Sequence, residues 1–554
     1  MTRVLPLSRA VALHVEPGMH LHFASTPSRS NAAVREVARQ FAGRAPGFVF
    51  SATGFHSSAH TLALLGLGRR YIGCFFGDNY PAPRPNVLYQ RLAEWPGVIE
   101  QWSLLGYVLA LRAGALGHPY AVTTSTGESE LGRELARAGR CFEVPDPQGG
   151  TEPVRLLTPI VPDLAFLHAA VGTPSGRALF CAPFGEGFWG ALAARSGVIV
   201  TVEKLVSDRE LDGFPDLLPL PAAKVLAIAE EPFGAHPQPL HVGSRGAPVA
   251  GYPDDFEAYA RWREWAQHPE LFAEYRRRVL EAPDGAAAYR DFAVPSRSAP
   301  SARPKADATP ADPWVLLAAR TIARRIRTNQ LEAVLAGIGQ SFGAARLALL
   351  LLGARAGSVE LLIETGISGF DPLHAHPFLL SAHNMAGARR LSAVEDNLGV
   401  VACGRHNRCL AVVGAAQADA AGNLNSSFVG GRFLVGSGGA ADLTAGARDV
   451  VVLCRADRLV PRVEYVTSPG ARVRCIVTEE AVLERAHAEA PWQLVAGIFA
   501  ERSARRIADS LPFEVTVRDD AEAFEPTAFE LETWAALAAE PKRPEPQELG
   551  RAHA

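Results

Sequence analysis

Short apolar runs of three to six residues alternate along the chain with segments whose apolar positions repeat at helical spacing. Runs of this length in an alternating pattern predict strands. The predicted strands are Phe48–Phe50, Tyr71–Phe76, Leu164–His168 and Val198–Val202 in the first half, and Val359–Ile363, Leu410–Val413 and Val450–Leu453 in the second. The predicted helices include Ala32–Phe41, Leu88–Trp95 and Gly343–Leu352. This alternation favours an α/β fold with parallel sheets covered on both faces.

The stretch Val294–Pro313 is rich in Pro, Ser and Ala and has no apolar periodicity, which indicates an exposed linker. We therefore predict a first domain at 1–290, a linker at 291–313, a second domain at 314–539 and a polar tail at 540–554. A faint repeat relates the halves: Leu164–Ala170 aligns with Leu410–Ala416 at an offset of 246 residues, with five identities when Gly176 and Gly422 are included. We interpret it as two related open α/β domains packed face to face, with a site between them.

Composition and charge exclude several functional classes. The chain has 554 residues and a net charge of −3, so it lacks the basic field of a nucleic-acid-binding protein. Lys occurs only at 204, 224, 305 and 542, never after a Gly-rich loop, which excludes a Walker-type site. The seven Cys form no CxxC pair and predict reduced thiols in a cytoplasmic protein. No run is long enough to cross a membrane, so we expect no membrane partner.

One carboxylate stands out. Glu364 ends the apolar run Leu361–Ile363 and precedes Thr365 and Gly366. Most acids at a strand end serve as ion-pair partners or helix caps. A carboxylate can also attack a thioester, whose carbonyl is electrophilic, to form an acyl-glutamyl anhydride. Such a nucleophile must be positioned and shielded from water, and the end of a buried strand before a glycine turn provides both.

Two Gly-rich segments follow. Gly436-Ser437-Gly438-Gly439 precedes a predicted helix at Ala440–Ala447, so its N–H groups and the helix dipole suit an oxyanion. The turn Gly414–Ser426 contains polar side chains that either bind substrate or satisfy the turn's own backbone. They are Gln417, Asn423, Asn425 and Ser426.

Together, these segments resemble the B component of family I CoA-transferases, most nearly glutaconate CoA-transferase. The segments are Glu364–Gly366, Gly414–Ser426, Gly436–Asp442 and Val463–Gly470. The first half resembles the matching A component in Pro162–Ala169, Val198–Glu203 and Pro232–Pro237. The resemblance covers about residues 1–290 and 315–485, and its motifs are specific as an ordered set.

The resemblance implies a fused A–B chain that moves CoA from an acyl-CoA donor to a carboxylic acid, with CoA as a substrate and no permanently bound cofactor. Glu364 would carry first the acyl group and then CoA, and an amide at Gly438 or Gly439 would stabilise the oxyanion. Gly366, Gln417, Asn425, Gly436 and Ser437 would contact substrate. A homodimer is also plausible.

The sequence departs from the family where the A component usually has a Gly-Gly turn, because this chain has Ala24–Ser30 there. Arg29 in that segment is either a partner for a substrate carboxylate or a solvated surface residue. Asn79, in the stretch Gly77–Tyr80, is a second candidate for the acid pocket. The identity of the carboxylic acid substrate stays open.

Two other functions stay open as well: an acyl-CoA hydrolase or decarboxylase on the same scaffold, and a non-catalytic protein that binds CoA ligands. The intact Glu364 favours transfer over both. His374, His376 and His383 are close in sequence, but their spacing fits no standard zinc pattern, and we predict no metal.

Overall fold

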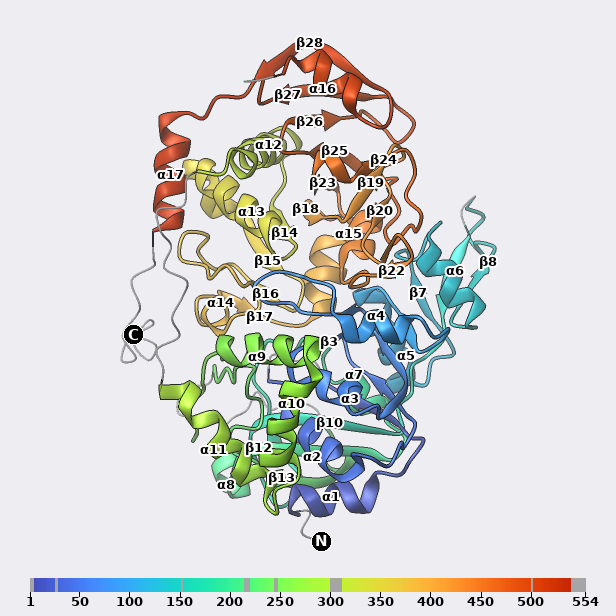
Figure 1. Ribbon diagram of the computed structural model, residues 1–554, viewed down its shortest axis with the longest axis vertical. Coiled ribbons are helices and arrows are strands. Elements are labelled where there is room, and N and C mark those ends of the chain that lie inside the picture. Colours follow the sequence, from blue (N-terminus) through green and yellow to red (C-terminus); the bar gives the residue numbers. More distant parts are fainter. Residues whose placement is uncertain are drawn as a thin grey trace.

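The computed structural model describes residues 4–24, 28–150, 153–213, 220–243, 248–298, 311–499 and 502–539. Its two halves are stacked along the long axis of the molecule, the first from blue to green and the second from yellow to red (Figure 1). Each half is built on one large, mainly parallel sheet with helices around it. The predicted α/β class with two related domains is therefore confirmed. None of the helices in the described residues is both long and apolar enough to span a bilayer.

The sheet of the first half has the order β13-β12-β10-β1-β2-β4-β6, with β11 on β10. Its strands are β1 (His20–Phe23), β2 (Phe48–Ser51), β4 (Gly68–Gly73), β6 (Ile99–Gln101), β10 (Leu164–Gly172), β11 (Ala178–Leu179), β12 (Gly197–Leu205) and β13 (Val225–Glu230). Two smaller sheets are β3 (Gly54–Phe55) with β5 (Phe75–Phe76), and β7 (Ala121–Thr123), β9 (Val154–Leu157) and β8 (Cys141–Val144). The predicted strand over Tyr71–Phe76 is thus divided, because β5 leaves the main sheet to pair with β3.

The helices of this half are α1 (Leu7–His14), α2 (Asn31–Phe41), α3 (His60–Leu64), α4 (Val87–Ala93), α5 (Leu104–Leu116), α6 (Glu130–Arg137), α7 (Trp189–Ala193), α8 (Asp208–Leu211), α9 (Phe256–Gln267), α10 (Pro269–Tyr275) and α11 (Gly285–Ser298). Helix α11 enters the range assigned to a linker, so residues 291–298 are helical and that boundary was wrong. Its Ala-rich start favours a helix, and Ala293 packs into the core of this half. Residues 299–310 of the predicted linker and the tail from residue 540 lie outside the described residues, and Pro313 at the end of the predicted linker begins α12.

The sheet of the second half has the order β17-β16-β15-β14-β18-β23-β25-β26-β27-β28. Its strands are β14 (Ala333–Ala336), β15 (Glu360–Ile363), β16 (Ile367–Ser368), β17 (Arg390–Leu391), β18 (Cys409–Gly414), β23 (Asp449–Leu453), β25 (Val473–Val477), β26 (Ala481–Glu484), β27 (Trp492–Gly497) and β28 (Val515–Ala523). Shorter strands beside it are β19 (Gln417–Asp419), β20 (Leu424–Asn425), β21 (Phe428–Val429), β22 (Arg432–Phe433) and β24 (Leu459–Val460). Its helices are α12 (Pro313–Asn329), α13 (Gln340–Leu351), α14 (Ala382–Ala386), α15 (Ala440–Gly446), α16 (Ala504–Ser510) and α17 (Ala528–Ala538), with a π-helix at Glu395–Ala402.

The two sheets share a topology. In the first half, β13, β12, β10, β1 and β2 are neighbours in that order, and every pair is parallel. In the second half, β25, β23, β18, β14 and β15 repeat the order, again with parallel pairs. The strands of the sequence repeat, β10 and β18, occupy equivalent positions. Strand β2 is therefore the counterpart of β15, which precedes Glu364.

One large apolar cluster spans both halves, since it contains Trp102 and Tyr107 of the first half together with Leu362 and Leu398 of the second. Hydrogen bonds to two buried carboxylates cross the same boundary. Asp442 accepts a hydrogen bond from the N–H of Leu105, in the first turn of α5, at 2.9 Å. Asp254 accepts one from Ala382, the first residue of α14, at 3.0 Å. Each half thus caps a helix of the other. Burial raises the pKa of both carboxyl groups to about 6.

These raised pKa values predict how stability depends on pH. A carboxyl group whose folded pKa exceeds its unfolded value is penalised when ionised, so the contribution of Asp442 to stability falls as pH rises from about 4 through about 6. Asp442→Asn should remove that dependence, which amounts to at most about 3 kcal/mol, and should not destabilise the protein at pH 7.5. Urea unfolding between pH 4.5 and 7.5 measures it.

The exposed carboxylate of Asp519 provides the matched control, because Asp519→Asn should leave the pH profile unchanged. A profile for Asp442→Asn that runs parallel to that of the wild type would contradict the assignment.

Candidate active site

Glu364 lies in a three-residue hairpin turn between β15 and β16, at the end of a strand whose last three residues are buried. Ile363 pairs with Ile367 across the turn. Gly366 has φ +104°, which side-chain-bearing residues rarely adopt. A Cβ atom on Gly366 would lie 2.4 Å from the carbonyl carbon and oxygen of Ser392. The glycine is therefore required twice, by its backbone conformation and by the close approach of another segment.

Backbone and amide hydrogen bonds hold the turn. The N–H of Ser392 donates to Gly366 O at 2.7 Å. Asn397, which is fully buried in the π-helix, donates from Nδ2 to Ile363 O at 2.8 Å and to Ile367 O at 3.0 Å. Its Oδ1 accepts from Arg390 at 3.2 Å. Sequence reasoning missed Asn397, because one Asn in a polar stretch carries no signal that it will meet two carbonyls so distant along the chain.

Dense packing surrounds the carboxyl group of Glu364, although part of the side chain stays accessible. Burial raises its pKa, and a hydrogen bond from its own backbone N–H opposes that shift. A carboxylate with a raised pKa is more basic and a better nucleophile than an exposed one. The neighbouring Thr365 hydroxyl is buried without a hydrogen-bond partner.

Backbone hydrogen bonds join the first half to the segment that supports this turn. Phe184 N–H donates to Ser392 O at 2.7 Å, and Val394 N–H donates to Gly185 O at 2.8 Å. Gly185 and Ala393 form a parallel bridge across the boundary. Because Ser392 and Ala393 are the residues that press on Gly366, the loop of the first half fixes the segment that supports Glu364.

The Gly-rich loop Gly436–Gly439 lies at the same boundary. The N–H of Gly438 donates to Cys74 O of the first half at 2.9 Å, and Leu104 N–H donates to Gly438 O at 3.0 Å. The predicted oxyanion role of Gly438 conflicts with this bond, because its N–H is already engaged. Gly439 N–H has no acceptor among the described residues, and a Cβ atom there would lie 3.5 Å from Leu398, next to Asn397. Consecutive residues of the π-helix thus contact the Glu364 turn and the glycine loop.

The other predicted substrate contacts in this half have internal partners. Asn425 is buried, donates from Nδ2 to Gln417 Oε1 at 2.9 Å and accepts the N–H groups of Ser427 and Phe428 at 3.1 Å. Ser437 is buried, and its hydroxyl donates to Gly438 O. Gly436 N–H donates to Ser426 O at 3.2 Å. These residues shape the loops, and their hydrogen bonds favour the structural interpretation of the polar turn.

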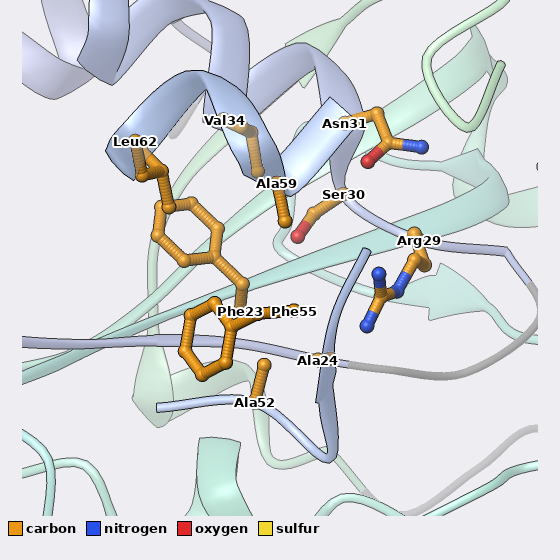
Figure 2. Close-up of a pocket in the computed structure, with 10 residues that line it drawn as sticks. All are labelled: Phe23, Ala24, Arg29, Ser30, Asn31, Val34, Ala52, Phe55, Ala59 and Leu62. Atoms are coloured by element: carbon orange, nitrogen blue, oxygen red, sulfur yellow. The ribbon is translucent and has the colours of Figure 1, made fainter. Parts of the chain in front are cut away.

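Arg29 and Asn79 both contact the Gly54–His56 segment of the first half. Arg29 is buried, which excludes a solvated surface residue, and its Nη2 donates to Gly54 O at 2.5 Å. Burial lowers its pKa to about 10. Figure 2 shows Arg29 on one side of a small pocket and the rings of Phe23 and Phe55 on the other. The cavity volume of about 10 Å³ holds about one water, so it is not a substrate pocket. Asn79 is also buried and contacts His56 Nε2 at 3.3 Å.

All seven cysteines have free thiols, as predicted. His374 pairs with Asp371, His383 contacts His374 O, and His376 stacks on Phe256 with ring centroids 5.1 Å apart. Within the described part of the chain, no group of three His, Cys, Asp or Glu side chains is arranged to hold a metal ion.

Comparisons with known proteins agree with this architecture. Residues 5–230 match the model of the Coenzyme A transferase family. Over 262 residues the chain is 28% identical to the A component of glutaconate CoA-transferase from Acidaminococcus fermentans, a match that covers 43% of this chain and 77% of that protein. An uncharacterized protein of Archaeoglobus fulgidus is 28% identical over 140 residues, 25% of this chain and 30% of its own.

Among solved structures, the acyl-CoA transferase YdiF of Escherichia coli O157:H7, in a thioester complex with CoA, superposes with a TM-score of 0.67. The match covers 95% of each chain at 13% sequence identity. At this identity the match establishes a shared fold across both halves.

Gly366→Ala should destabilise the protein by at least about 2 kcal/mol, because it combines backbone strain with a collision at Ser392. Gly430→Ala is the matched control: Gly430 also has a positive φ, +57°, but no atom lies within 4 Å of the added Cβ. Urea unfolding of both variants separates the two effects. Equal losses would mean that the contact with Ser392 contributes nothing.

Asn397→Ala should cost roughly 1–3 kcal/mol, since it removes two hydrogen bonds to buried carbonyls, of which Ile363 O keeps the N–H of Gly366. Asn384→Ala serves as the control, because Asn384 is equally buried and also donates to backbone carbonyls. Hydrogen exchange should accelerate at residues 363–368 only in the Asn397 variant. Faster exchange there in both variants would show that the turn responds to general loss of stability.

Proposed function

We propose that the chain is a family I CoA-transferase that moves CoA from an acyl-CoA donor to a carboxylic acid, with Glu364 as the covalent nucleophile; the family match of residues 5–230 and the shared fold support this. The observation that carries the proposal is the position of Glu364, on a rigid turn at the end of a buried strand and braced by both halves. Within the described residues, no other acid lies directly between a buried strand and a glycine turn with a φ like that of Gly366.

In the first half-reaction, a carboxylate oxygen of Glu364 attacks the thioester carbonyl carbon. The C–S bond breaks, CoA leaves as a thiolate, and an acyl-glutamyl anhydride forms. The thiolate then attacks the glutamyl carbonyl, which releases the donor acid as a carboxylate and leaves a glutamyl-CoA thioester. No proton or water is consumed. The raised pKa of Glu364 makes its carboxylate a stronger attacking group.

The second half-reaction reverses the order. The acceptor carboxylate attacks the glutamyl thioester, the thiolate leaves, and it then attacks the acceptor acyl carbon of the new anhydride. The products are acceptor acyl-CoA and the free carboxylate of Glu364. Water would hydrolyse both intermediates, so the packed boundary between the halves protects them.

Each attack places negative charge on a carbonyl oxygen. We assign its stabilisation to Gly439 N–H, which precedes α15 and has no acceptor within the described residues. Gly438 N–H supports this arrangement indirectly, because its bond to Cys74 fixes the loop on the first half. An oxyanion-hole donor is typically worth about 3 kcal/mol of barrier.

The test is Glu364→Gln. It should lower the transfer rate about 10³-fold or more, because an amide cannot form the anhydride. Glu360→Gln, in the same strand but half-exposed beside Arg390, should retain activity. Intact-protein mass spectrometry should find a CoA adduct on the wild type and on Glu360→Gln after exposure to an acyl-CoA. The acid limb of the pH profile of kcat/KM should lie above pH 4.5, because the attacking form is the carboxylate.

Normal turnover or an intact adduct in Glu364→Gln would overturn the assignment. Supplying the donor with and without a carboxylic acid separates transfer from the alternatives. Acyl-CoA consumption that proceeds without an acceptor would indicate hydrolysis or decarboxylation.

A further inference from the structure

The first half carries buried polar side chains at sheet positions where the second half carries leucines. The equivalent strands β10 and β18 align the two sheets, so His22 of β1 corresponds to Leu335 of β14, and Ser51 of β2 corresponds to Leu362 of β15. Leucines fill these positions in the second half, so close packing of the sheet does not by itself require polar groups there.

A chain of hydrogen bonds joins these polar side chains to Glu186. His22 Nδ1 lies 3.1 Å from Ser51 Oγ, and His22 Nε2 lies 3.0 Å from Glu186 Oε1. Ser51 Oγ also lies 2.8 Å from His20 Nε2. His22, Ser51 and Glu186 are each at most 1% exposed. A carboxylate is costly to bury, and apolar residues of similar volume are often as stable, so this pair requires an explanation other than stability.

Glu186 lies in a tight turn whose backbone contacts the second half. Gly187 N–H donates to Phe184 O at 2.8 Å, and Gly185 and Gly187 have φ +54° and +72°. Phe184 N–H and Gly185 O form the two backbone bonds to the 392–394 segment of the second half. The carboxylate of Glu186 instead bonds to β1, so it anchors the turn in its own half.

The ring of His22 packs against the helix that follows this turn. A Cβ atom on Gly190, in α7, would lie 2.2 Å from His22 Nε2, the atom that bonds to Glu186. A side chain there would therefore displace the ring. The preceding Trp189 donates from Nε1 to Glu395, in the π-helix of the second half. The two ends of this segment thus contact the second half, and its middle is bound to β1.

We infer that Glu186 is a positioning residue for Glu364, and that its bond to His22 sets where the turn meets the second half. The inference rests on the proposed transfer reaction. The turn bonds to the 392–394 segment, and that segment presses on Gly366, two residues after the nucleophile. A displacement of the turn is therefore passed through main-chain contacts to Glu364. A misplacement of about 1 Å can lower a rate about 100-fold.

Ser51, His22 and Glu186 also have the order of a serine hydrolase triad. A nucleophilic serine must reach its substrate, and Ser51 has no exposed surface. Its hydroxyl is also shared with a second histidine, His20. Ser51→Ala should therefore leave turnover nearly unchanged, since the bond from His22 Nε2 to Glu186 does not involve the serine, and Tyr107 OH remains 3.3 Å from His22 Nδ1.

Glu186→Ala and Glu186→Gln test the inference on the full chain. The donor is whichever of acetyl-CoA, butyryl-CoA and succinyl-CoA forms the CoA adduct fastest on the wild type, with acetate as the acceptor. Glu186→Ala should lower kcat about 10- to 100-fold and leave KM for the acyl-CoA within about 2-fold, because it displaces the turn and removes no substrate contact. Glu186→Gln should keep kcat within about 3-fold of the wild type, since its amide oxygen still accepts from His22 Nε2–H.

Hydrogen exchange reports the placement of the turn without turnover. Exchange at residues 392–397 and 363–368 should accelerate in Glu186→Ala and stay at the wild-type rate in Glu186→Gln. The double variant His22→Leu/Glu186→Leu separates position from stability, because a buried apolar pair keeps the packing without the directed bond. It should melt within about 5 °C of the wild type and still show the lowered kcat. This variant decides the matter if Glu186→Ala does not fold.

Asp449→Ala is the matched control. Asp449 is also a buried, paired carboxylate, with Arg325 Nη2 at 2.7 Å, but it begins β23 and so lies at the edge of the second sheet opposite the Glu364 turn. Its substitution should lower the melting temperature, leave kcat unchanged and cause no selective acceleration of exchange at 392–397.

Wild-type kcat and exchange in a folded Glu186→Ala, or wild-type kcat in the double variant, overturns the inference. So does an equal acceleration at 392–397 in Asp449→Ala. Loss of turnover in a folded Ser51→Ala with wild-type exchange at 392–397 also overturns it and would indicate a nucleophilic serine.

The two proposals fail separately. A wild type that forms no CoA adduct loses the transfer reaction, and the exchange measurements still test whether Glu186 places the turn. A wild type and a Glu186→Ala variant that form the adduct equally fast keep the transfer reaction and remove the role of Glu186.

Discussion

The contact between Gly366 and the backbone of Ser392 and Ala393 is the constraint on which the rest of the site depends. It brings a segment from beyond the hairpin close enough to exclude even a methyl group, and Ser392 N–H bonds the glycine carbonyl. Asn397 then ties together the carbonyls on both sides of the turn. Glu364 is consequently oriented by main-chain packing, and its charge is left available for chemistry.

The same contact joins the two halves. Ser392 and Val394 are held from the other side by Phe184 and Gly185 of the first half. The Glu364 turn is therefore complete only when both halves are assembled, and their presence in one chain makes that assembly intramolecular. The shared apolar cluster and the reciprocal helix caps by Asp254 and Asp442 explain how the boundary stays closed at the cost of two buried carboxyl groups.

The shared topology gives the halves different roles at equivalent places. Beyond β15, one half presents a carboxylate with a raised pKa. Beyond β2, the other presents unpaired donors beside a buried guanidinium. In the proposed reaction the first forms bonds to the acyl group and to CoA. A duplicated fold thus presents different groups at equivalent places.

The sequence by itself determined the α/β class, most of the predicted strands and the place of Glu364 at a strand end, because these follow from local periodicity and from glycine at a turn. It also indicated the glycine loop, but not that Gly438 N–H bonds to Cys74 across the boundary. The hydrogen bonding of Asn397, His56 and Ser57 was decided only by the tertiary structure. Each depends on which groups from distant segments supply or withhold a hydrogen-bond partner, and no local pattern encodes that pairing.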